Sequence, residues 1–195
     1  MIKRIQDIQG FLRTFLKNVL EPGDIALDLT AGRGRDTLFL AQTVGPYGRV
    51  YAFDIQQEAI HATRQLLESN SMQERVELFC MDHSRLGEVV TKPIKAAMFN
   101  LGYLPGGDTG ITTKPESTIK ALSQALSLLK VNGIIVLTIY RGHEGGSQEA
   151  QGVNQVLMAL SKRDFSVLEG KYINQAINSP YWVVVQKNRG IIYES

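Results

Sequence analysis

The sequence contains a single cysteine, Cys80, among its 195 residues, which excludes a disulfide framework and a cysteine-rich metal site. Long apolar runs are also missing: no segment approaches the roughly 20 apolar residues that cross a bilayer, and the first residues carry charges rather than an apolar signal core. Neither sign of charge dominates, since 21 Lys and Arg stand against 19 Asp and Glu. These absences predict a cytoplasmic protein without membrane contact, with Cys80 as a buried structural thiol.

What is present is the composition of an ordinary globular domain, with 44% hydrophobic and 21% charged residues. Apolar residues in 1–21 recur at spacings of three and four and stop at Pro22 and Gly23, which predicts an N-terminal helix packed on the rest of the chain. Repeats and linkers are absent from the sequence. We therefore expect a single domain over 1–195.

The remaining pattern alternates between short apolar runs and helical periods. Predicted strands cover 25–30, 50–54, 76–81, 94–100 and 134–140, and predicted helices cover 36–43, 57–70, 115–130 and 148–163. Such alternation indicates a parallel sheet covered by helices on both faces. The last two strand-like runs, 166–172 and 181–187, have no helix between them and are expected to pair antiparallel. The pattern predicts an α/β, Rossmann-like fold of class I methyltransferase type, with a seven-stranded, mostly parallel sheet and a C-terminal antiparallel hairpin.

A glycine-containing loop follows the first predicted strand and opens a helix. Gly32 and Gly34 allow a tight bend and a close approach of a ligand to the backbone. A dinucleotide fingerprint requires a third glycine, where this chain has Thr37. The carboxylates of Asp28 and Asp36 beside the loop favour a cationic ligand over a diphosphate. The loop therefore favours S-adenosylmethionine, which has a sulfonium and an ammonium group but no phosphate, over NAD.

Further acidic residues stand at the ends of the next two predicted strands. Asp54, twenty positions after Gly34, is expected to accept hydrogen bonds from ribose hydroxyls. Asp82 is expected to accept from the adenine amine, with Gln56 and His83 lining the pocket. All of these positions fall at the carboxyl edge of a parallel sheet, where such folds bind ligands. The predicted cofactor-binding residues are Asp28, Gly32, Arg33, Gly34, Asp36, Asp54, Gln56, Asp82 and His83.

Two segments after the fourth and fifth strands are candidates for the acceptor side. Enzymes that methylate exocyclic amines often carry Asn- or Asp-Pro-Pro-Tyr/Phe after the fourth strand, and this chain keeps Asn100 and Tyr103 of that pattern without the prolines. The side-chain oxygen of Asn100 would accept from the amine. His143, within the glycine-rich segment 140–146, is a candidate base. A glycine-rich turn and a surface-loop histidine are the alternatives for these residues.

Taken together, these motifs point to one family of proteins. Phe53-Asp-Ile-Gln56, Asp82-His-Ser84, Asn100-Leu-Gly-Tyr-Leu-Pro-Gly-Gly-Asp108 and Tyr140-x-Gly-His143 resemble the MnmM/YtqB family, long labelled rRNA methylases. The resemblance implies S-adenosylmethionine-dependent methylation of 5-aminomethyl-(2-thio)uridine at the tRNA wobble position, with the anticodon stem-loop as partner. An rRNA base amine, a small-molecule acceptor and a non-catalytic cofactor-binding module stay open as alternatives.

RNA contacts would come from scattered basic and aromatic side chains, because the net charge is small. Tyr103 or Tyr181 could stack an extruded base. The acidic residues and histidines show no metal-ligand spacing, so no metal is expected. A monomer and a homodimer are both compatible with the sequence. The candidate phosphate partners are Lys3, Arg4, Arg13, Lys114 and Arg141, with Lys17 and Lys171 as further possibilities.

Overall fold

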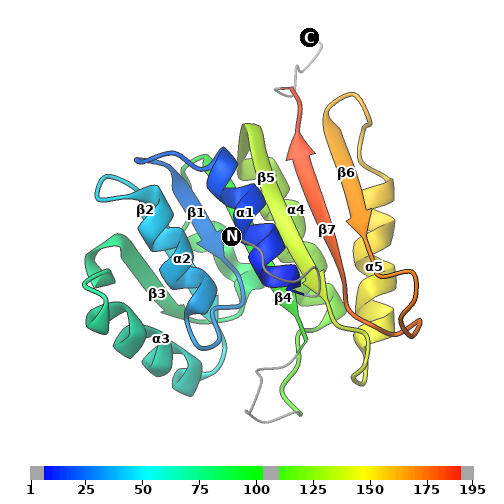
Figure 1. Cartoon of the computed structure of the whole chain (residues 1–195), viewed down its shortest axis with the longest axis horizontal. Coiled ribbons are helices and arrows are strands. Elements are labelled where there is room, and N and C mark those ends of the chain that lie inside the picture. Colours follow the sequence, from blue (N-terminus) through cyan, green and yellow to red (C-terminus); the bar gives the residue numbers. More distant parts are fainter. Residues whose placement is uncertain (1–6, 103–109, 190–195) are drawn as a thin grey trace.

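A seven-stranded sheet in the order β3-β2-β1-β4-β5-β7-β6 forms the centre of the computed structural model, which describes residues 7–102 and 110–189 (Figure 1). Strands β1 to β5 are parallel, and β7 lies antiparallel to both of its neighbours, β5 and β6. The predicted Rossmann-like α/β fold with its C-terminal antiparallel strands is confirmed. The strands are β1 (Ile25–Asp28), β2 (Arg49–Asp54), β3 (Val76–Cys80), β4 (Ile94–Leu101), β5 (Leu129–Ile139), β6 (Phe165–Gly170) and β7 (Tyr181–Lys187).

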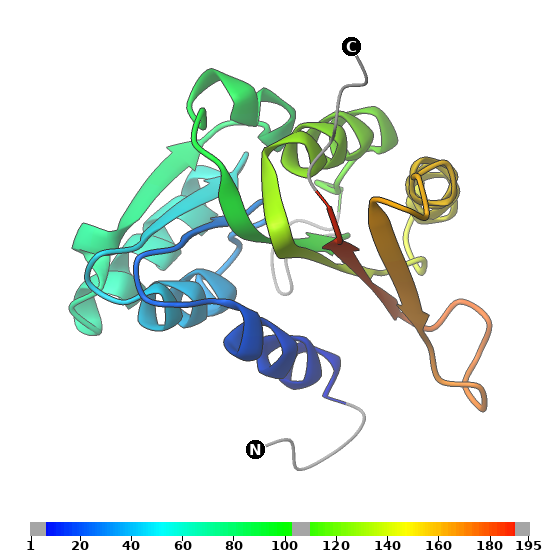
Figure 2. The same ribbon diagram turned by 90° about the horizontal axis from the view of Figure 1, so that it is seen from above.

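Helices cover both faces of this sheet, with α1, α2 and α3 on one side and α4 and α5 on the other (Figure 2). Each side has its own cluster of buried apolar side chains. The central strands β4 and β5 are buried on both faces, which explains why their sequences are nearly continuous apolar runs. The helices are α1 (Ile8–Val19), α2 (Arg35–Val44), α3 (Gln57–Ser69), α4 (Pro115–Leu128) and α5 (Gly146–Met158), with the short 3₁₀ turns η1 (Gln73–Arg75) and η2 (His83–Glu88).

Helix α1 is held on the sheet by the apolar stripe that the sequence predicted. Leu12 and Leu16 are fully buried in the cluster shared with α2. Phe11 packs against Trp182 of β7, with ring centroids 5.1 Å apart. Asp7 caps the helix by accepting from the backbone N–H of Gly10 at 2.8 Å. These contacts fix the beginning of α1 over the central strands.

Two boundaries differ by five residues from the sequence-based prediction. Strand β5 begins at Leu129 and not at 134, because Leu129 already pairs with Ile94 before a register shift. Asn132, within that early part, has a left-handed φ of 59°, which is typical of a bulge and resembles a turn in sequence. Helix α5 ends at Met158 and not at 163, since the chain must turn before β6 begins.

Cys80 is exposed, so its prediction as a buried thiol is wrong. It ends β3, which is an edge strand paired with β2 alone. Apolar runs are buried on both faces only in the central strands of such a sheet. Because β3 is at the edge, none of its side chains is fully buried.

Candidate active site

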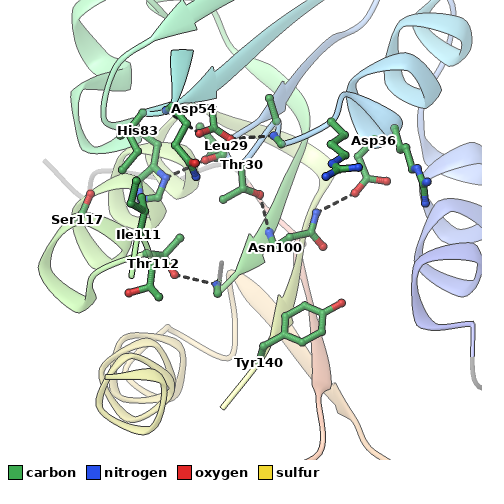
Figure 3. Close-up of a pocket in the computed structure, with 18 of the residues that line it drawn as sticks. Leu29, Thr30, Asp36, Asp54, His83, Asn100, Ile111, Thr112, Ser117 and Tyr140 are labelled. Carbon is green, nitrogen blue, oxygen red and sulfur yellow. Dashed lines mark hydrogen bonds between the residues drawn. The ribbon is translucent and has the colours of Figure 1, made fainter. Parts of the chain in front are cut away.

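A cleft of about 840 Å³ opens at the carboxyl ends of the parallel strands (Figure 3). Its walls come from the glycine loop, the segments that follow β2, β3, β4 and β5, the chain before α4, and the first turns of α1. The strand ends meet here because parallel strands run in the same direction. The cleft therefore brings together most of the residues from which the sequence predicted a cofactor site, and Asn100 of the predicted acceptor site.

The two loop glycines have different tasks. Gly32 lines the cleft, and its backbone N–H donates to Asp54 Oδ2 at 2.9 Å. Gly34 lies off the cleft wall, with a left-handed φ of 78° at the start of α2. A Cβ at Gly34 would stand 2.9 Å from the Cα of Thr63 in α3. Gly34 thus permits close packing of two helices, which differs from the ligand approach that the sequence predicted.

Asp28 is fully buried and does not line the cleft, contrary to its predicted contact with the cofactor. Its carboxylate accepts from the hydroxyl of Thr37 at 2.6 Å and from the backbone N–H of Thr30 at 3.3 Å. Burial, together with the nearby charge of Asp36, raises the pKa of Asp28 to about 7. Asp28 therefore holds the glycine loop from the protein interior, through Thr30 and Thr37 on either side of that loop.

Asp54 and Asp82 line the cleft at the predicted strand ends. Asp54 Oδ1 accepts from the backbone N–H of Gln56 at 3.0 Å, which fixes the carboxylate at the cleft wall. Asp82 Oδ1 accepts from the backbone N–H of Ser84 at 2.7 Å and from the hydroxyl of Ser117. Burial alone would raise the pKa of Asp82, but these hydrogen bonds outweigh it and hold the pKa below its ordinary value. Both side chains are therefore suited to accept hydrogen bonds from a ligand.

His83 is 8% exposed and has a defined tautomer. Its Nδ1 lies 2.8 Å from the carbonyl oxygen of Leu29, which can only accept, so Nδ1 carries the proton. In the neutral ring Nε2 is then an acceptor, and it is buried without a partner among the described residues. Because His83 lines the cleft, Nε2 can accept from a ligand N–H.

Asn100 connects the acceptor side to the glycine-loop helix. Its Nδ2 donates to Asp36 Oδ2 at 2.8 Å, and Asp36 Oδ1 accepts from Arg13 Nη2 at 2.6 Å. Its Oδ1 accepts from Gln9 Nε2 at 2.5 Å, and its backbone N–H donates to Thr30 Oγ1 at 2.7 Å. Asn100 is thus oriented by α1, α2 and the loop after β1, and its side chain lies on the cleft wall (Figure 3).

Sequence reasoning missed several wall residues, among them Gln9 and Tyr140. Gln9 and Arg13 are one helical turn apart on α1, a polar pair beside the buried stripe, and that spacing was the available signal. Tyr140 directly follows β5 at the same edge as Asn100. Tyr140 was part of a motif in the sequence, but only His143 of that motif was considered as a catalytic residue.

His143 is not on the cleft wall. Its Nδ1 lies 2.9 Å from the carbonyl of Glu144, and a Cβ at Gly146 would stand 2.9 Å from its Nε2. Gly146 therefore makes room for the imidazole ring. The placement does not favour the predicted role of His143 as a base.

Of the predicted RNA contacts, Lys114 is exposed at the cleft wall, whereas Arg13 is engaged with Asp36. Arg141 donates to the carbonyl oxygen of Ser179 at 3.3 Å and lies 4.9 Å from the ring centroid of Tyr181. Tyr181 is 4% exposed, so the structure contradicts its prediction as a stacking platform for an extruded base.

The two lysines predicted as further phosphate partners lie on exposed surface. Lys17 is exposed on α1. Lys171 pairs with Glu169 at 3.3 Å. Lys3, Arg4 and Tyr103 lie outside the described residues.

Within residues 7–102 and 110–189, none of the helices combines the length and apolar character that a membrane crossing requires. The same residues contain no group of three or more His, Cys, Asp or Glu side chains arranged to hold a metal ion.

The sheet order, the glycine loop after β1 and the acidic residues after β2 and β3 define the class I methyltransferase fold. Residues 50–186 match the family model described as "Putative rRNA methylase". The chain belongs to this family, and the resemblance to MnmM/YtqB proteins is confirmed.

Similar proteins of known sequence or structure agree with this assignment. The chain is 37% identical over 171 residues to the "tRNA (mnm(5)s(2)U34)-methyltransferase, chloroplastic" of Arabidopsis thaliana, a match that covers 83% of this chain and 62% of that protein. A Clostridium thermocellum structure described in the same words as the family model has a TM-score of 0.91 and 41% identity, covering 94% of this chain and 99% of the other. A Streptococcus mutans protein in complex with S-adenosylhomocysteine has a TM-score of 0.84 and 34% identity, covering 96% and 99%.

Proposed function

We propose that the protein is an S-adenosylmethionine-dependent methyltransferase that converts 5-aminomethyl-(2-thio)uridine at the tRNA wobble position to the 5-methylaminomethyl form. The observation that carries the proposal is the 2.8 Å contact between Asn100 and Asp36, because it joins the amine-binding position after β4 to the helix of the glycine loop. The name of the Arabidopsis relative supports the substrate. The bound S-adenosylhomocysteine in the Streptococcus mutans relative supports the cofactor.

The residues of the cleft fit this cofactor. Asp54, fixed by backbone N–H groups, is suited to accept from both ribose hydroxyls. Asp82 and the acceptor atom Nε2 of His83 stand where an adenine amine needs acceptors. Gly32 gives the wall beside the loop the small size that a closely approaching ligand requires.

S-adenosylmethionine, when bound, would supply a methyl group on its sulfonium sulfur. The amine nitrogen would bond to the methyl carbon as the C–S bond breaks, and the electron pair of that C–S bond would stay on sulfur. The extra proton of the product would pass to water. The chain's own contribution is alignment. Asn100 Oδ1 accepts from the substrate amine and directs its lone pair, which lowers the entropic barrier to an in-line reaction. Asp36 and Arg13 keep that oxygen in place.

The RNA would meet the protein at the mouth of this cleft. Arg35 and Lys114 are exposed and lie on the cleft wall, so we assign them to phosphate contacts. Arg33, exposed on the same wall, keeps the cofactor contact predicted for it from the sequence. Tyr140 is 38% exposed on the same wall, so we assign it the stacking role predicted from the sequence for Tyr103 or Tyr181. The cytoplasm is the proposed location because the proposed substrate is tRNA.

A methyl-transfer assay tests the proposal. The protein is incubated with isotopically labelled S-adenosylmethionine and a synthetic anticodon stem-loop that carries 5-aminomethyl-2-thiouridine, and the digested nucleosides are identified by mass spectrometry. We expect the labelled 5-methylaminomethyl nucleoside, and no label in a matched stem-loop with unmodified uridine. Transfer only to rRNA or to a small metabolite would contradict the assigned substrate.

A further inference from the structure

The hydrogen bonds around Asn100 determine the orientation of two side-chain amides. One carboxylate oxygen of Asp36 accepts from the guanidinium of Arg13. The other oxygen is an acceptor as well, so the atom that faces it must be a donor. The atom of Asn100 that lies 2.8 Å from Asp36 is therefore the amide nitrogen, and the amide oxygen of Asn100 faces Gln9. The ion pair between α1 and α2 thus fixes which way Asn100 points.

The same reasoning continues to Gln9. The atom of Gln9 that lies 2.5 Å from Asn100 Oδ1 must be a donor, so it is Nε2. Its second proton goes to Thr138 Oγ1 at 2.9 Å. Both donors of the Gln9 amide are therefore used, and exchanging its oxygen Oε1 with the nitrogen would set two acceptors, Oε1 and Asn100 Oδ1, against each other.

Oε1 of Gln9 has no partner among the described residues, although it is buried and Gln9 lines the cleft. A buried carbonyl oxygen without a hydrogen bond is costly, typically by as much as the whole net gain of a normal hydrogen bond. A ligand that brings an N–H group to this oxygen removes the cost.

We propose that Gln9 Oε1 and Asn100 Oδ1 together form a pair of acceptors for the two N–H groups of a primary amine. This inference rests on the proposed function and deepens it. A neutral primary amine has two N–H groups and one lone pair, so two acceptors bind both hydrogens and leave the lone pair for the methyl group. Asn100 Oδ1 has one lone pair engaged by Gln9 and a second one for the substrate.

The acceptor pair also explains how the reaction stops after one methyl group. The methylated product is a secondary amine with a single N–H, so one of the two buried oxygens loses its donor and the product binds less well. Gln9 is in this view a specificity-determining residue supplied by the N-terminal helix. The ion pair of Arg13 with Asp36 acts through Asn100 and is a positioning interaction.

Gln9→Met tests the proposal, because it keeps the length of the side chain and removes Oε1. Single-turnover methyl transfer is measured with two stem-loops, one with a 5-aminomethyl and one with a 5-methylaminomethyl uridine, alongside cofactor affinity and Tm. We expect the wild type to prefer the primary amine, and Gln9→Met to lose roughly 10- to 100-fold in rate on that substrate, with cofactor affinity unchanged. The preference for the primary amine should fall by a similar factor.

Two further variants distinguish the loss of the Oε1 acceptor from a general effect of the substitution on folding. Gln42→Met, the same substitution at an exposed position of α2, should leave both rates unchanged. Thr138→Val removes the other partner of Gln9 Nε2 but keeps Oε1, so it should lower Tm while the preference for the primary amine persists. A wild-type preference that survives in Gln9→Met would overturn the inference and leave the proposed function intact. An inactive wild type on both stem-loops would overturn the proposed function and the inference with it.

Discussion

The two halves of the cleft are built in different ways. On the cofactor side, Asp54 and Asp82 are fixed by N–H groups two residues further along the chain, those of Gln56 and Ser84. On the acceptor side, Asn100 is fixed by residues 64 and 91 positions away. Local turns therefore take part in shaping the cofactor half, together with contacts over 22 to 54 positions, whereas the side chain of Asn100 is held entirely by elements 64 and 91 positions away. Variants in the two halves should separate binding from chemistry.

The largest effect is expected from Asn100→Ala, which removes the acceptor at the centre of the network. We expect the single-turnover rate of methyl transfer to fall by about 100-fold or more with cofactor affinity nearly unchanged, since the contact acts mainly in the transition state. Asn18→Ala on the exposed side of α1 is the matched control. His143→Ala should lose much less, because its ring lies off the cleft wall. An equal loss of rate and cofactor affinity in Asn100→Ala would show that the halves are not separable.

The complementary variant on the cofactor side is Asp54→Ala. It removes the proposed ribose acceptor and leaves the N–H of Gly32 without its partner, so cofactor binding should weaken by about 1–3 kcal/mol. Calorimetry with S-adenosylhomocysteine measures the change, and Glu58→Ala at the exposed start of α3 is the control. Unaltered affinity in Asp54→Ala would remove this residue from the cofactor site.

A smaller loss of cofactor affinity is expected from His83→Phe. The ring keeps its packing against Phe99, but the acceptor Nε2 is gone, which should weaken binding by about 5-fold. His61→Phe on the exposed surface of α3 controls for the substitution itself. If cofactor affinity stays constant while Tm falls, the role of His83 is limited to its bond with Leu29.

The smallest effect concerns stability and its dependence on pH. Asp28 has a folded-state pKa of about 7, above its ordinary value of 3.8, so the folded protein holds this proton more tightly than the unfolded chain. Its contribution to stability is therefore complete below about pH 4 and is lost as the pH rises through about 7. Asp28→Asn should reduce the drop in Tm between about pH 5 and about pH 8 by a few degrees.

The exposed acid Glu116 provides the control for that experiment, because Glu116→Gln should leave the pH profile of Tm as it is in the wild type. A drop in Tm of the same size in Asp28→Asn and the wild type would mean that Asp28 does not bind its proton more tightly on folding.

The same contrast explains what the sequence could predict. The sheet and the positions of Asp54 and Asp82 follow from the alternation of apolar runs and from the rule that ligands bind at the carboxyl ends of parallel strands. Asp28 satisfied the same rule but turned inward toward Thr37. The direction in which a side chain points depends on its packing, and a single-sequence pattern does not contain that information.

The acceptor half was only partly predictable for the same reason. Asn100 was found from a motif, but its connection to Gln9 joins segments far apart in the chain. Cys80 shows the opposite error, since its local apolar run gave no sign that β3 would be an edge strand. Topology, which emerges only when all strands are in place, decided both cases.

The polar anchors of α1 also constrain the order of events during synthesis. The helix is made first, yet its partners Asn100 and Thr138 follow Gln9 by 91 and 129 residues. At typical translation speeds, the ribosome needs about 6 to 25 s to add the later of these residues. Until β4 and β5 have been made, the buried stripe of α1 has neither strand to cover it, and its apolar side chains are available to a chaperone. The acceptor half is thus completed late in synthesis, only after its last partner, Thr138, has been made.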